Sequence, residues 1–69
     1  MKLLSVVALL EEMPERALSR GQVGTIVEDL APDVYEVEFL DDEGRTYACV
    51  PLQAGQLMQL HHSPRHQAA

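Results

Sequence analysis

The clearest pattern of hydrophobic and polar positions lies at residues 34–40. The side chains of Tyr35, Val37 and Phe39 would lie on one face of an extended chain. The intervening Glu36 and Glu38 would lie on the opposite face. This period of two predicts a half-buried antiparallel strand whose outer face is acidic.

Three other segments carry strand signals. β-branched and aromatic residues favour a pleated strand, and they predict strands at residues 23–30 and 45–50, with a short last strand at 57–60. Proline cannot donate a hydrogen bond to a central ladder, so Pro51 is expected to end the fourth strand. Residues 52–56 would then form a single helical turn before the last strand.

The N-terminal segment, residues 3–10, is apolar nearly throughout. Its pattern suits a buried helix and a buried strand equally well. The short length and the adjacent Val6 and Val7 favour the strand. Pro14 ends this element, and residues 11–20 form a polar connection with Ala17 and Leu18 as its expected inward anchor.

Glycine and proline mark the expected turns. Gly21 and Gly24 precede the strand residues 25–27, where they can make a tight turn or let two backbones pass closely. Gly44 supplies the positive φ of a hairpin at residues 41–44. We therefore treat Gly21, Gly24 and Gly44 as the structural turn glycines, and we expect a further turn at residues 31–33.

Together these elements predict an all-β fold, a small five-stranded SH3-like barrel at residues 1–60. Residues 61–69 lack apolar periodicity, and we expect them to form a flexible polar tail. The longest apolar run, residues 6–10, is far shorter than the roughly 20 residues that a membrane-spanning helix needs. We therefore expect a cytoplasmic protein without a membrane partner.

Four stretches carry a resemblance to a known family. They read SVVALLE at 5–11, RGQVGTIVE at 20–28, YEVEF at 35–39 and GRTYA at 44–48. Across residues 3–60 the chain resembles the short bacterial proteins of domain of unknown function 4926, although that family usually has aspartate in place of Ser5. The resemblance implies a small SH3-like fold and brings no activity. Residues 21–28 also resemble the KOW motif, whose modules meet RNA or protein partners.

Several groups of polar residues are candidates for chemistry, and each has a plainer interpretation. Adjacent histidines in a strand point to opposite faces, so we interpret His61, His62 and His66 as parts of a polar tail, with no metal site. No histidine lies near Cys49 in sequence, and we expect a buried or half-buried thiol that is not a nucleophile.

The acidic hairpin and the aromatic residues also lack a catalytic pattern. The hairpin at 41–44 lacks the oxygen spacing of a calcium loop. Glu36 and Glu38 have no aromatic sugar platform beside them, and we expect Tyr35, Phe39 and Tyr47 in the core. We therefore expect no catalytic residue, no cofactor and no enzyme activity.

Charge gives the main indication of function. The net charge is −6, and the few Lys and Arg residues are scattered, which makes nucleic acid an unlikely partner. The acidic residues instead predict a partner-facing surface, which we assign to Glu28, Asp29, Glu36, Glu38, Asp41 and Asp42.

The leading hypothesis is a non-catalytic module that docks to another protein. Such a module could be antitoxin-like, or accessory to a basic partner. Self-assembly into a homo-oligomer through edge strands at residues 3–10 and 57–60 is a second form of this hypothesis. The alternatives are a subunit or regulator of an enzyme, and an RNA-associated KOW-like module.

Overall fold

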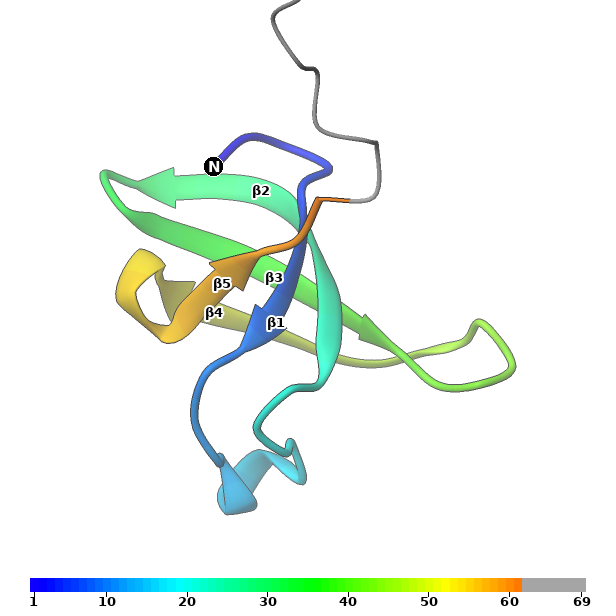
Figure 1. Ribbon diagram of the computed structural model, residues 1–69. Helices are drawn as coiled ribbons and strands as arrows, with labels where there is room; N and C mark the ends of the chain where they lie inside the picture. The colour runs from blue at the N-terminus through cyan, green and yellow to red at the C-terminus, as the bar shows by residue number, and fades with distance from the viewer. Residues whose placement is uncertain (62–69) are drawn as a thin grey trace, which may run out of the picture.

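The protein is a single bent sheet in the computed structural model, which describes residues 1–61 (Figure 1). The five antiparallel strands are β1 (Val6–Leu9), β2 (Val23–Ala31), β3 (Val34–Leu40), β4 (Thr46–Gln53) and β5 (Leu57–Gln59). Two 3₁₀ turns, η1 (Pro14–Arg16) and η2 (Ala54–Gln56), connect them. The predicted all-β fold, with a one-turn helix before the last strand, is confirmed.

The order of the strands across the sheet is β4-β3-β2-β1-β5. No ladder joins β4 to β5 within the described residues, so the sheet is open where the sequence predicted a barrel. Ten of the twelve predicted bounds of the five strands and the helical turn agree with the structure to within two residues. The predicted tail lies outside the described residues, apart from the exposed His61.

The core lies on the concave side of the bent sheet. Cross-strand neighbours share a face, so the register brings Ile26, Val37 and Val50 together as one inward row. The alternation predicted for β3 is confirmed, because Tyr35, Val37 and Phe39 are all buried. Tyr47 was expected in the core, but it lies exposed at a register shift in β4.

The connection between β1 and β2 contributes one core side chain. Leu18 is 1% exposed, and its backbone pairs with Met13 across the η1 turn. Ala17 was predicted to share this role, but it is exposed at the left-handed C-cap of η1, with φ 57°. The left-handed backbone directs the Ala17 side chain outward, so Leu18 anchors the connection together with the partly buried Met13, which packs against the core.

The first strand is shorter than the predicted segment of residues 3–10. Residues 1–5 form a turn instead, in which Ser5 N–H donates to the Lys2 carbonyl and Lys2 N–H donates to Ser5 Oγ. Leu4 has a left-handed φ of 68°, and its N–H donates to the Ile26 carbonyl at 2.7 Å. An extended backbone at this position would lose these turn contacts.

The prediction that Pro51 ends the fourth strand is wrong, because β4 continues to Gln53. The Ile26 carbonyl accepts a hydrogen bond from the Leu4 N–H, and the Ile26 N–H donates to the Ser5 carbonyl. Both backbone groups of Ile26 therefore point away from β3. Backbone groups alternate in direction along each strand, so the register places the nitrogen of Pro51 toward the open edge of β4. No ladder hydrogen bond is lost there, and proline is tolerated.

Two of the three predicted turn glycines lie in turns with positive φ, Gly21 at 88° and Gly44 at 81°. Gly24 lies within β2 instead and faces the core. A Cβ atom at Gly24 would lie 2.8 Å from Val37 Cγ1, 2.9 Å from the Glu38 carbonyl oxygen and 2.9 Å from Phe39 Cε1. Gly24 therefore serves the second predicted role, close approach of two strands.

Candidate functional site

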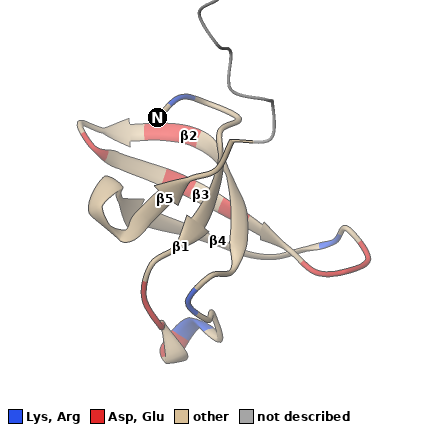
Figure 2. Cartoon of the chain, in the orientation of Figure 1, with Lys and Arg blue, Asp and Glu red and all other residues tan. Residues whose placement is uncertain are grey.

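The outer face of the sheet carries three glutamates on neighbouring strands. Glu28 on β2 is the direct cross-strand neighbour of Glu36 on β3. Glu38 lies two residues further along β3, so it shares the outer side of the sheet with Glu36. We call Glu28, Glu36 and Glu38 the acidic face. Figure 2 shows the acidic positions along β2 and β3.

No cation neutralises the acidic face within residues 1–61. The two ion pairs of this part of the chain both belong to Arg45, in the β3–β4 hairpin. Arg16 and Arg20 lie in the connection between β1 and β2 (Figure 2). Among residues 1–61, Thr46 Oγ1 donates a hydrogen bond to Glu38 Oε2 at 2.7 Å. Like charges directly opposite destabilise a sheet, so the Glu28–Glu36 pair carries a cost that no cation of residues 1–61 offsets.

Cys49 lies on this same outer side, as the cross-strand neighbour of Glu38. It is exposed, which corrects the prediction of a buried or half-buried thiol. The sequence analysis placed Tyr47 in the core, but Tyr47 is exposed, and Cys49 lies two residues further along the same strand, on the same side. Desolvation and the nearby carboxylates, Glu36 above all, raise the pKa of the thiol. A raised pKa is the opposite of what a nucleophile requires.

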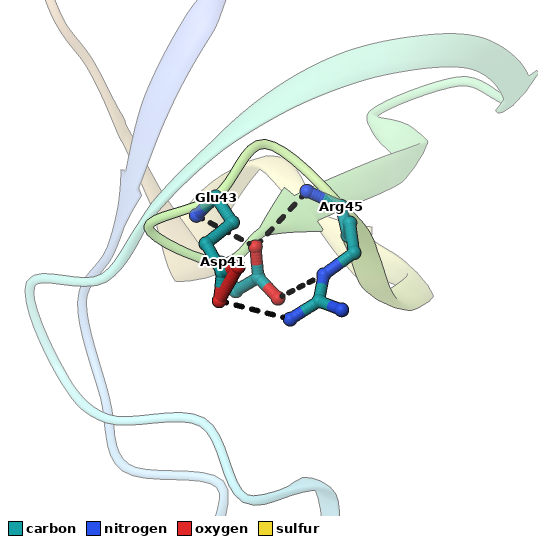
Figure 3. Close-up of polar contacts among 3 residues, drawn as sticks. All are labelled: Asp41, Glu43 and Arg45. Atoms are coloured by element: carbon teal, nitrogen blue, oxygen red, sulfur yellow. Dashed lines mark hydrogen bonds and ion pairs between the residues drawn. The ribbon is translucent and has the colours of Figure 1, made fainter.

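The hairpin acids lie apart from the acidic face, at the tip between β3 and β4 (Figure 3). Asp41 Oδ1 accepts hydrogen bonds from the backbone N–H of Glu43 at 2.9 Å and of Arg45 at 3.0 Å. Asp41 Oδ2 accepts a hydrogen bond from the Arg45 side chain, Nε–H, at 3.3 Å. The Arg45 N–H bond is the main cause that lowers the pKa of Asp41. The carboxylate is therefore occupied in holding the loop, whereas Asp42 stays exposed.

Asp29 is also separated from the acidic face. Its cross-strand neighbour is Tyr35, whose side chain lies in the core. Asp29 consequently occupies the other side of the sheet from Glu28, at the exposed end of β2. Of the six acids assigned from sequence, the structure brings together Glu28, Glu36 and Glu38.

A row of apolar side chains beside the acidic face was missed by the sequence analysis. Met58 on β5, Ala8 on β1 and Val23 on β2 are direct cross-strand neighbours. The next row, which contains Leu9 and Leu57, is buried, so the row with Ala8 faces outward. Both sides of β1 are apolar, so no alternation in its sequence could reveal which side faces outward, and Ala8 itself is buried between its neighbours.

Other kinds of site find no support in residues 1–61. This part of the chain holds no group of three His, Cys, Asp or Glu side chains placed to bind a metal ion. It also contains no helix with the length and apolar character needed to cross a membrane.

Comparisons with known proteins identify the family. No curated protein and no solved structure matches the chain. The family described as Domain of unknown function (DUF4926) matches residues 3–59, which is most of the chain. The resemblance noted from the four sequence stretches is thereby confirmed, and the protein belongs to this family of domains of unknown function.

Proposed function

We propose that this protein is a non-catalytic binding module that docks its acidic face against a basic surface of another protein. The observation that carries the proposal is the direct pairing of Glu28 with Glu36, beside Glu38 and with no ion pair to a cation among residues 1–61. Cross-strand partners lie about 5 Å apart at Cβ. Lysine or arginine side chains of a partner would remove the repulsion between these carboxylates and gain charge-assisted hydrogen bonds.

The edge strands of the sheet are β4 and β5, because β1, predicted as an edge, lies between β2 and β5. The β4 edge is poorly suited to self-assembly, which favours docking to a different protein. Pro51 has no N–H to offer at that edge, and Gln53 N–H already donates to Gln56 Oε1 at 2.8 Å. Both features reduce the donors available to an added strand. A second copy would also bring two acidic chains together, because the net charge is −6.

The proposal is tested by affinity capture from the native cell, with a matched neutral variant. The wild-type chain and the triple variant Glu28→Gln, Glu36→Gln, Glu38→Gln would each be immobilised. We expect a basic protein to be retained by the wild type, lost from the variant, and released as salt is raised from 0.05 to about 0.5 M, where charge interactions are screened.

A control variant separates the acidic face from net charge. Replacing Glu11, Glu12 and Glu15 by glutamine removes the same number of charges from the β1–β2 connection. We expect this variant to retain the partner. Equal capture by the wild type and the acidic-face variant would contradict the proposal.

A further inference from the structure

The acidic face continues into an exposed apolar area on the same outer side of the sheet. In the Met58–Ala8–Val23 row, Met58 is 51% exposed and Val23 is 50% exposed, while the small Ala8 between them is 7% exposed. We call Met58, Ala8 and Val23 the apolar face. The row Val6–Thr25–Glu38 connects it directly to the acidic face.

We infer that this combined surface binds an amphipathic helix of another protein, with a hydrophobic stripe flanked by Lys and Arg. The inference rests on the proposed function and adds the kind of partner. The hydrophobic stripe would cover the apolar face, and the basic flank would meet the acidic face. An anionic membrane surface would be repelled by the same carboxylates, which therefore select a basic protein segment.

A helix suits this surface better than an extended strand. The surface is a sheet face, which offers side chains and no free backbone groups. An extended strand laid on it would lose water from its own N–H and C=O groups without gaining partners. A helix satisfies these groups internally and presents side chains alone. Addition of a strand at the β4 edge is opposed by Pro51 and by the Gln53–Gln56 contact.

The experiment uses the full chain and two designed peptides of about 18 residues, which are roughly 27 Å long as helices. The first peptide has a leucine stripe flanked by lysine. The second keeps every lysine and replaces each leucine by serine. Both peptides carry a fluorophore, and their binding is measured by fluorescence anisotropy at 0.15 M salt.

The protein variants are Met58→Ser with Val23→Ser, the triple glutamine variant of the acidic face, and the control Leu30→Ser.

Leu30 is a matched control because it is 45% exposed and lies in β2 seven residues beyond Val23. We expect the wild type to bind the leucine–lysine peptide at least tenfold more tightly than the serine–lysine peptide. The Met58→Ser, Val23→Ser variant should weaken the first peptide about tenfold, as expected when two half-exposed apolar side chains are lost. Leu30→Ser should leave the affinity unchanged. Circular dichroism checks that each variant is folded.

The outcomes separate the inference from the proposed function. If both peptides bind the wild type equally, and only the glutamine variant weakens them, the helix inference is overturned and the acidic docking face stands. If neither peptide binds, or the glutamine variant binds as well as the wild type, the proposed function and the inference both fail. If sedimentation shows that the wild type is a dimer that Met58→Ser, Val23→Ser dissociates, the occupant is a second copy and the inference is overturned.

Discussion

Substitution of Gly24 by alanine tests the close approach of β2 and β3. The added methyl group would lie 2.8 Å from Val37 Cγ1 and 2.9 Å from both the Glu38 carbonyl oxygen and Phe39 Cε1. Val37 and Phe39 are fully buried, and the carbonyl belongs to the β3 backbone. None of these three atoms can move without disturbing the core or the ladder.

The expected destabilisation follows from two opposing effects. Overpacking a well-packed core costs about 1–3 kcal/mol, and contact on three sides places Gly24→Ala near the upper end. Alanine also restricts the unfolded chain, which returns about 0.4–1 kcal/mol. The net loss is therefore about 2 kcal/mol in the free energy of unfolding. A single core of this size rarely supplies more than about 3–5 kcal/mol, so the variant would retain about 1–3 kcal/mol.

The assay is urea unfolding followed by far-ultraviolet circular dichroism, with Gly55→Ala as the control. Gly55 lies in η2, and an added Cβ would have no heavy atom within 4 Å. We expect the control to be as stable as the wild type or more stable by up to about 1 kcal/mol, because alanine restricts the unfolded chain. An unfolding midpoint for Gly24→Ala equal to that of the control would refute the close-packing argument.

Three further perturbations test other features of the structure. Glu36→Gln should raise the free energy of unfolding by about 0.2–1 kcal/mol at low salt, because it removes the repulsion with Glu28, and high salt should abolish the difference. Pro51→Thr restores an N–H at the open β4 edge, and sedimentation should show concentration-dependent association that the wild type lacks. The lowered pKa of Asp41 stabilises the fold above the ordinary aspartate value of about 3.9. The stability advantage of the wild type over Asp41→Asn should therefore be present at pH 7 and disappear as the pH falls below about 4, and a constant difference would contradict the loop assignment.

The parts of the fold that the sequence predicted correctly are those with a strong local signal. The alternation at residues 34–40 predicts both the bounds of β3 and its buried face. Gly44 and Asp33 have positive φ values of 81° and 60°, as the turn chemistry of the two hairpins requires. Each of these features depends on a few neighbouring residues and on the pleat of one strand.

The incorrect predictions depend on contacts between distant segments. Whether proline ends a strand is decided by the direction of the missing N–H group, which depends on the register of β4 against β3. The apolar run at residues 3–10 is divided between a turn and a strand because Leu4 and Ser5 bond to Ile26. Similarly, the exposed position of Cys49 follows from its pairing with Glu38, which depends on the register of β4 against β3.

The assignment of the acidic surface has the same origin. Sequence alone groups acids by their proximity along the chain, so it placed Asp29 beside Glu28 and Asp41 beside Glu38. The register separates them, because Asp29 pairs with Tyr35 and Asp41 holds the hairpin through Arg45. It also brings Glu28 opposite Glu36 across the β2–β3 hairpin. A fold that can place Arg45 between two carboxylates at the hairpin tip, yet leaves the acidic face without a cation in the described residues, carries a cost in stability that binding of a basic partner would recover.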